Sequence, residues 1–242
     1  MSTLRALGWW GLTLALLPVV LPQALWTRRT ALRLPPAGGD AHGLAGGEFA
    51  GAPLRLLVLG ESSVAGVGVA ELEAALASQL ALALAQRLRR PVAWRAHGEN
   101  GITAGQACQR LLPAALAEPA DLALLVFGVN DTTHLSSLQA WGAALARLAA
   151  ALGGQGSRVC FTGVPPIEHF SALPWLLRQL LGLRARQMDG RLRQVCAEVG
   201  AGYQRLNLDF TAALLAEDGY HPSALGYRVW AEGLAERLSS SV

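Results

Sequence analysis

The sequence contains no lysine, and its 20 basic residues are all arginine. This absence excludes lysine Schiff-base enzymes, a pyridoxal phosphate anchor and the P-loop lysine of nucleotide-binding proteins. Against 17 acidic residues the formal net charge is only +3, and no aromatic-plus-basic binding module is present. We therefore do not expect nucleic acid as a partner.

Cysteine is also scarce. Cys108, Cys160 and Cys196 are too far apart for a C-x-x-C metal or redox motif, and their number is odd. Buried structural thiols are the expected role. The sequence has no H-E-x-x-H motif and no Cys/His cluster, so we expect neither a metal nor a cofactor.

Charged residues make up only 15% of the 242 residues, whereas apolar residues make up 52%. This composition excludes a disordered chain. The length fits one medium-sized domain plus an appendage.

The longest uncharged stretch runs from Ala6 to Trp26. About 20 apolar residues cross the hydrocarbon core of a bilayer as a helix, so this segment is just long enough. Trp9, Trp10 and Trp26 lie near its two ends, where aromatic rings favour the membrane interface. We expect residues 1–33 to form a membrane anchor or a signal-like segment.

Three interpretations of this segment stay open: an uncleaved anchor to the bacterial inner membrane, a cleavable signal peptide, and a hydrophobic arm lying on a surface. No small-x-small cleavage site follows; the chain continues instead into Arg28, Arg29 and Arg33. Only Arg5 and the amino terminus flank the other side. The positive-inside rule then favours a cytoplasmic over a periplasmic domain by about one charge.

Residues 34–52 are rich in glycine, proline and alanine and are expected to be a flexible linker, with the folded domain over residues 53–242. Short apolar runs then alternate with segments of helical periodicity. Strands are predicted over residues 55–59, 92–96, 121–127, 158–162 and 203–206. Helices are predicted over residues 70–90, 104–117, 135–152, 173–199 (broken near Gly182) and 223–238. This alternation predicts an α/β fold of three layers, with a parallel sheet covered by helices on both faces.

In such folds ligands bind beyond the carboxyl ends of the strands, so the residues after each strand are the candidates. The first strand is followed by Gly60-Glu61-Ser62-Ser63, which can expose the Ser62 hydroxyl on a tight turn. A glycine-rich turn of this kind can instead cradle a phosphate. However, the third glycine of the dinucleotide motif and the P-loop lysine are both missing.

The next two strands end in polar turns. Gly101 would let a backbone N–H approach a substrate oxygen, although an ordinary turn before a helix capped by Thr103 is the alternative. Asn130 could offer its amide to a developing oxyanion, or it could cap a helix together with Asp131.

Near the carboxyl terminus Asp218 precedes His221 by three residues. A carboxylate at this spacing can accept a hydrogen bond from the imidazole Nδ1 and leave Nε2 free to take a proton from serine. Alternatively, Asp218 and His221 are ordinary polar residues on the surface.

Together these segments resemble the SGNH/GDSL hydrolase family, whose four blocks carry Ser, Gly, Asn and His. Ser62, Gly101, Asn130 and the Asp218-x-x-His221 pair stand in the family's order and at its places in the α/β alternation. The resemblance covers roughly residues 53–240. It implies a flavodoxin-like parallel sheet of about five strands, preceded here by the hydrophobic helix.

The resemblance is imperfect in two places. Glu61 stands where the family usually has Asp, and the block containing Gly101 is matched only loosely. Among family members the chain looks most like bacterial lysophospholipase-like or acyl-esterase proteins.

The resemblance implies a serine esterase without cofactor. Ser62, His221 and Asp218 would form the triad, and the Ser62 and Gly101 N–H groups with the Asn130 amide would form the oxyanion hole. The expected substrate is a small acyl ester or a lysophospholipid-like lipid. An O-acyltransferase or deacetylase acting on envelope glycans and a silent membrane-tethered binding protein are the alternatives. Residues 161–170, after the fourth strand, are expected to form one wall of the substrate pocket.

Overall fold

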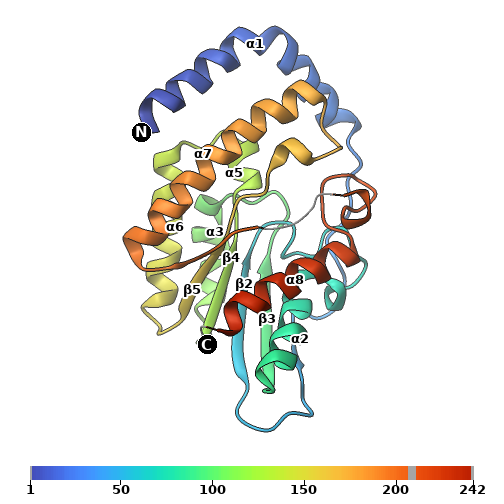
Figure 1. Ribbon diagram of the computed structural model, residues 1–242, viewed down its shortest axis with the longest axis vertical. Helices are drawn as coiled ribbons and strands as arrows, with labels where there is room; N and C mark the ends of the chain where they lie inside the picture. The colour runs from blue at the N-terminus through green and yellow to red at the C-terminus, as the bar shows by residue number, and fades with distance from the viewer. Residues whose placement is uncertain (1, 207–210, 241–242) are drawn as a thin grey trace.

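The computed structural model describes residues 2–206 and 211–240, in which a six-stranded sheet forms the centre of the molecule (Figure 1). Its strand order is β1-β3-β2-β4-β5-β6. The strands are β1 (His42–Ala45), β2 (Leu54–Gly60), β3 (Val92–Gly98), β4 (Leu122–Val126), β5 (Arg158–Thr162) and β6 (Gly202–Gln204). Strands β2 to β6 are parallel, whereas β1 pairs antiparallel with β3 at the edge.

Helices cover both faces of the sheet (Figure 1). The α-helices are α1 (Ser2–Thr30), α2 (Leu76–Leu88), α3 (Ala104–Arg110), α4 (Leu112–Ala115), α5 (Val129–Thr133), α6 (Leu138–Gly153), α7 (Trp175–Val199) and α8 (Ala224–Ser239). Three 3-10 turns are η1 (Leu72–Ala74), η2 (Ile167–His169) and η3 (Ala212–Leu214). Helices α2 and α8 pack on one face, and α3, α6 and α7 pack on the other.

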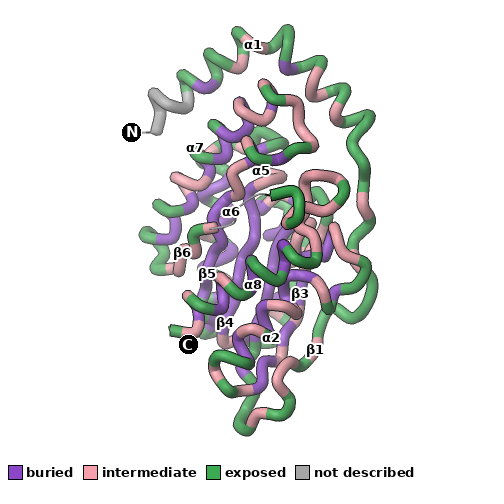
Figure 2. Tube along the Cα trace, turned by 45° about the vertical axis from the view of Figure 1, so that its right-hand side comes forward, coloured by how far each residue is buried: buried purple, intermediate pink, exposed green. Residues whose placement is uncertain are grey.

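Strand β2 shows why the sheet needs both layers. Leu56 and Val58 join the core under α2 and α8, whereas Leu57 and Leu59 join the core under α6 and α7. Successive side chains of a strand point to opposite faces, so an uninterrupted apolar run requires cover on both sides. Figure 2 shows the resulting buried centre.

The predicted fold is confirmed. Each of the five predicted strands is present, with its ends shifted by at most two residues. The parallel strands follow the order β3-β2-β4-β5-β6, which is the flavodoxin-like order 2-1-3-4-5.

The segment expected to be a flexible linker differs from that prediction, because it contributes β1. The four residues of β1 pair with β3 over its first half, from Val92 to Arg95. Gly43 lies opposite Trp94, and a Cβ on this glycine would lie only 2.9 Å from the indole Nε1. The glycine that reads as a linker signal therefore makes room for an aromatic side chain over the edge strand.

Helix α7 is continuous from Trp175 to Val199, so the predicted break near Gly182 is wrong. A Cβ on Gly182 would overlap the side chain of Glu168 in η2. The glycine allows η2 to pack closely on α7, and the helix tolerates its low propensity because the surrounding contacts stabilise it.

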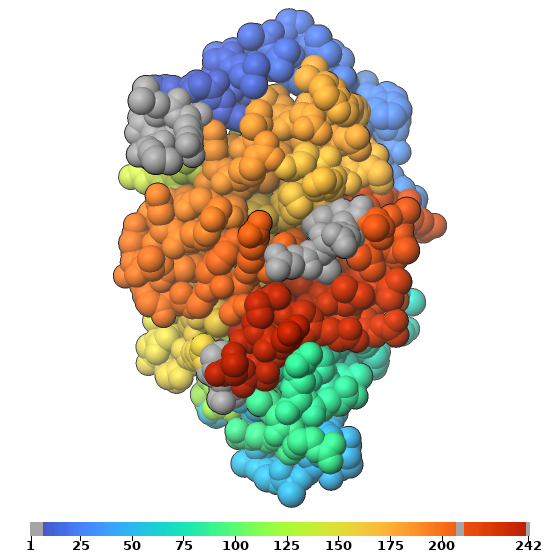
Figure 3. Space-filling model, viewed as in Figure 1, coloured from blue at the N-terminus to red at the C-terminus, as the bar shows by residue number. Residues whose placement is uncertain are grey.

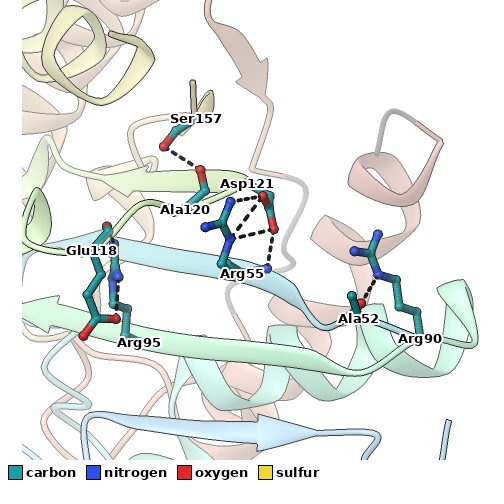
Figure 4. Close-up of polar contacts among 8 residues, drawn as sticks. All are labelled: Ala52, Arg55, Arg90, Arg95, Glu118, Ala120, Asp121 and Ser157. Carbon is teal, nitrogen blue, oxygen red and sulfur yellow. Dashed lines mark hydrogen bonds and ion pairs between the residues drawn. The ribbon is translucent and has the colours of Figure 1, made fainter. Parts of the chain in front are cut away.

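The amino ends of the strands are tied together by polar contacts (Figure 4). The Asp121 carboxylate accepts hydrogen bonds from the backbone N–H of Arg55 at 2.8 Å and from the guanidinium of the same residue. The Ser157 hydroxyl donates to the Ala120 carbonyl at 2.8 Å. These contacts lie at the opposite end of the sheet from the loops that carry the predicted site.

Helix α1 lies along α7 at the end of the molecule toward which the parallel strands point (Figure 1). By length and composition, residues Leu7–Thr30 could cross a membrane. Most of the helix is exposed (Figure 2). However, Trp9 and Val20 are buried against the domain.

Candidate active site

The structure brings together Ser62, His221 and Asp218, which lie far apart in the sequence. The Ser62 Oγ lies 2.9 Å from the His221 Nε2, and the His221 Nδ1 lies 2.6 Å from the Asp218 Oδ2. Ser62 lies two residues beyond β2, and the other two lie in the loop before α8. The line of contacts is the one that serine activation requires: hydroxyl, imidazole, carboxylate.

The Asp218 carboxylate is nearly buried, with 3% of its side chain exposed. Its Oδ1 accepts hydrogen bonds from the backbone N–H groups of Tyr220 at 2.9 Å and of His221 at 3.0 Å. Burial disfavours the charged carboxylate, but these bonds and the imidazole outweigh it and hold the pKa of Asp218 below its ordinary value. The carboxylate therefore stays ionised and can orient the imidazole.

Helix α8 holds the turn that carries Ser62 and the loop that carries His221 side by side. The buried Tyr227 hydroxyl donates to the Val67 carbonyl at 2.7 Å, which ties α8 to the turn after Ser62. Ser223 caps α8 by accepting a hydrogen bond from the Gly226 N–H, and it directly follows the loop that carries His221.

The predicted oxyanion-hole residues also converge. The Asn130 Nδ2 donates to the Ile102 carbonyl at 3.0 Å, which joins the loops after β4 and β3. An amide nitrogen carries two hydrogens, so the second can serve a substrate oxygen. Gly101 has a φ of +82°, and no atom lies within 4 Å of where its Cβ would stand. The open space leaves its backbone accessible to a ligand.

The alternative capping roles are also present. Thr103 caps α3 in a reciprocal arrangement with Gln106. Asp131 is buried, and its Oδ2 accepts a hydrogen bond from the Ala104 N–H at 2.8 Å. Burial raises the pKa of Asp131 above its ordinary value, although the Ala104 bond opposes this. Thr103 and Asp131 thus secure the loops that carry Gly101 and Asn130.

Sequence reasoning gave Glu61 no role, yet its carboxylate connects the turn that carries Ser62 to the start of α5, which carries Asn130. The side chain is buried and accepts hydrogen bonds from the backbone N–H groups of Gly128 and Asn130, the second at 3.1 Å. Burial raises the pKa of Glu61 to about 8, while these N–H groups oppose the shift. The adjacency of Glu61 to Ser62 was the only sequence signal of this role.

An apolar pocket opens beside Ser62 and His221. The segment after β5, expected to form a wall, contributes Thr162, Pro165 and Phe170. Phe161 instead packs into the core on the α7 side. The other walls come from β4 and the carboxyl-terminal segments, and include Val126, Phe127, Leu206, Leu214, Leu215, Tyr220 and Trp230.

Within residues 2–206 and 211–240, no group of three or more His, Cys, Asp or Glu side chains is placed to hold a metal ion. The three cysteines are free and buried. Burial raises the pKa of Cys196 to about 12, so this thiol is unreactive near neutral pH.

The chain belongs to the GDSL-like Lipase/Acylhydrolase family, whose sequence profile matches residues 58–229. It is also similar to the GDSL-like esterase Rv1075c of Mycobacterium tuberculosis, with 25% identity over 189 residues. That match covers 74% of this chain but only 60% of the mycobacterial protein.

Solved structures share the fold at low identity. A lipase/acylhydrolase from Enterococcus faecalis superimposes with a TM-score of 0.62 at 18% identity, covering 77% of this chain and 96% of that one. The psychrotrophic esterase EstA from Pseudoalteromonas sp. superimposes with a TM-score of 0.61 at 15% identity, covering 77% and 97%. At these identities the likeness extends to the fold alone.

Proposed function

We propose that the protein is a serine esterase that hydrolyses acyl esters through Ser62, His221 and Asp218. The observation that carries the proposal is the unbroken contact line from the Asp218 carboxylate through the imidazole to the Ser62 hydroxyl. Family membership supports the same activity.

The reaction follows from this geometry. The Ser62 Oγ attacks the ester carbonyl carbon while the His221 Nε2 takes its proton, and Asp218 stabilises the imidazolium that forms. The imidazolium then protonates the departing alcohol and leaves an acyl-serine. A water molecule attacks that acyl group, its proton passes to the imidazole, and the carboxylic acid and free Ser62 are released. The Ser62 and Gly101 N–H groups and the Asn130 amide stabilise the oxyanion in both steps.

The proposed substrates are small acyl esters or lysophospholipid-like lipids. The pocket beside Ser62 is lined mainly by apolar side chains, which suit an acyl chain. We further propose that α1 associates the domain with the bacterial inner membrane, where such lipids reside. Arg28, Arg29 and Arg33 favour the cytoplasmic face, because basic residues next to a membrane segment are attracted to the anionic lipids of that leaflet.

The first test compares the full-length protein with its Ser62→Ala variant in detergent, using p-nitrophenyl acetate, butyrate and octanoate. We expect hydrolysis by the wild type and a loss on the order of 10⁴-fold or more in the variant, because the hydroxyl is the nucleophile. Circular dichroism controls for folding. Equal activity of the two proteins would show that the assigned triad is wrong. An inactive but folded wild type would instead favour transfer to a glycan acceptor or a silent binding protein.

A second test concerns the acyl pocket. Phe170 lines the pocket and packs edge-to-face on Tyr220, with ring centroids 4.8 Å apart. Removing its ring should lower kcat/KM for the octanoate ester by about tenfold relative to the acetate ester, since a buried aromatic ring contributes roughly 1.5–3 kcal/mol. The measurement is the ratio of the two kcat/KM values for wild type and Phe170→Ala. An unchanged ratio would place the acyl chain elsewhere.

A further inference from the structure

Helix α1 contacts the domain along one narrow stripe. Trp9, Leu16, Val20 and Ala24 pack against the core that includes the apolar side of α7. Their spacing of seven, four and four residues places them on one face of a helix. The rest of the helix circumference faces away from the protein (Figure 2).

Polar contacts hold both ends of this stripe. The Trp9 Nε1 donates to the Leu180 carbonyl at 2.9 Å, and the Arg184 guanidinium lies 5.3 Å from the Trp9 ring centroid. Fourteen residues further on, the Gln23 Oε1 accepts a hydrogen bond from the Leu177 N–H at 3.2 Å. Leu177 is in the first turn of α7, where N–H groups have no partner within the helix, so Gln23 caps α7.

The outward face of α1 is apolar along its length. No charged residue stands between Arg5 and Arg28. Trp175, at the start of α7, adds an indole that is 66% exposed. The large exposed side chains of this surface on α1 are Leu7, Trp10, Leu12, Leu14, Leu17, Val19, Leu21, Leu25 and Trp26. So large a continuous apolar surface is unfavourable in water and indicates a partner.

A spanning orientation conflicts with the contacts beneath α1. If α1 crossed a bilayer while docked, α7 would have to enter the hydrocarbon with it. Helix α7 carries Arg178, Arg184 and Arg186 within about two turns, and charged side chains in the hydrocarbon core are strongly unfavourable. Tryptophans at positions 10, 26 and 175 also suit the interfacial layer better than the bilayer centre.

We propose that α1 lies parallel to the surface of a lipid bilayer, with its outward face in the interfacial layer and its stripe docked on α7. Arg28 and Arg29 are exposed at its carboxyl end and face anionic headgroups. Figure 3 shows α1 as a ridge at one end of the molecule, resting on α7. Phe170 of the pocket lies five residues before α7 begins, so the membrane surface adjoins the pocket wall. This last consequence, access to single-chain lipids from the bilayer, rests on the proposed esterase function.

The test measures depth at three positions on one face of α1. Leu7, Leu14 and Leu25 are all exposed, and their spacing places them on the side of the helix opposite the docked stripe. Each is changed singly to cysteine in the full-length protein, labelled with a nitrobenzoxadiazole dye and bound to phosphatidylglycerol vesicles that contain shallow or deep spin-labelled lipids. The unsubstituted protein controls for labelling, since its three cysteines are buried.

We expect the same shallow depth at all three positions, about 5–10 Å below the headgroups. A deep label at Leu14→Cys with shallow labels at the other two would show a spanning helix and overturn the proposal. Absence of quenching at all three would also overturn it, because the surface would then meet protein rather than lipid.

Docking variants supply an independent check. Trp9→Phe combined with Gln23→Leu removes both polar contacts, so the three labels should lose their equal depth. Trp10→Phe, on the outward face, is the matched control and should keep it. Unchanged equal depth in the docking variant would show that the contacts with α7 do not orient the helix.

Headgroup charge gives a further readout. Arg28→Ser and Arg29→Ser should each weaken binding to phosphatidylglycerol vesicles about fivefold and leave binding to phosphatidylcholine unchanged. Equal loss on both lipids would contradict the contact with anionic headgroups. None of these measurements needs catalysis, so failure of the esterase proposal would not be mistaken for failure of this one.

Discussion

Glu61 is one methylene longer than the aspartate of the family's usual block, and its carboxylate reaches the segment after β4. The acceptor oxygens bind the N–H groups of Gly128 and Asn130. The same Asn130 directs its side-chain amide toward the loop of Gly101 by donating to Ile102. Glu61 thus acts on the proposed oxyanion hole through the backbone of Asn130, as a positioning residue.

Glu61→Gln tests this role. A glutamine offers one acceptor oxygen, and its NH₂ group faces the other backbone N–H, so one hydrogen bond is lost. Because such a bond to a carboxylate contributes about 1.5–3 kcal/mol, kcat measured above pH 8, where Glu61 is ionised, should fall by roughly tenfold or more with little change in KM. The kcat–pH profile should also lose the ionisation near pH 8 that the raised pKa of Glu61 predicts. An unaltered kcat and pH profile would reduce Glu61 to a structural residue.

Two further variants provide comparisons for the result with Glu61→Gln. Asn130→Ala removes an oxyanion donor directly and should cost about 10²–10³-fold in kcat, more than the loss of its positioning residue. Glu61→Asp keeps the charge but shortens the reach, so it should not restore the wild-type rate. Recovery in the aspartate variant would mean that charge alone matters at this position.

The residues that the sequence predicted for the site differ from Glu61, which it did not predict, in how visible they are in the sequence. Ser62, Asn130, Asp218 and His221 each follow a strand or precede a helix within a recognisable block, so their order along the chain already brings them to one edge of the sheet. The contacts of Glu61 join positions 67 and 69 residues apart. No local pattern encodes such contacts, and they depend on side-chain length in the folded protein.

Among the elements, α7 and η2 act as one unit. Gly182 lets η2 approach the helix, and Glu168 in η2 forms an ion pair with Arg186 one turn further along. Because η2 lies directly before Phe170, this packing sets the position of the pocket wall.

Gly182→Ala and Gly190→Ala form a matched pair on α7. The first places a methyl group into the side chain of Glu168 and should lower stability by about 1–3 kcal/mol through overpacking. The second meets nothing within 4 Å and should stabilise the helix by about 0.5–1 kcal/mol. Thermal unfolding and the octanoate-to-acetate ratio of kcat/KM measure both effects, and we expect only Gly182→Ala to change the ratio. Similar behaviour of the two variants would show that η2 can move at no cost.

Gly43 and Gly182 also explain why the sequence predicted two elements wrongly: a flexible linker where β1 forms, and a break in α7. Both glycines read locally as breaks, one in a linker and one in a helix. In the structure each is required because another segment approaches closely. The buried strands were predicted well because continuous apolar runs such as Leu122–Val126 carry their own signal, independent of distant partners.

Among the described residues, exposed and buried charged side chains differ in how strongly they affect the stability of the whole molecule. The ion pair of Arg55 with Asp121 is half exposed, so water screens it and it contributes little to stability. The Glu61 carboxyl, like that of Asp131, is buried and has a raised pKa, so its titration is coupled to folding of the domain.

The pH dependence of global stability is therefore the broadest prediction. Burial raises the pKa of Glu61 to about 8, against about 4.3 in an unfolded chain, so the folded protein binds this proton more tightly. Its stabilising contribution is complete below about pH 4.3 and is lost as the pH rises through 8. The Glu61→Gln variant has no titrating group at this position. The free energy of unfolding of the wild type, minus that of the variant, should thus decrease from pH 5 to pH 8 by up to about 1.4 kcal/mol per pH unit. Urea unfolding of both proteins in the same detergent measures this difference. The two proteins share every other titrating group. A constant or rising difference would therefore mean that Glu61 is already ionised in the folded protein at pH 5.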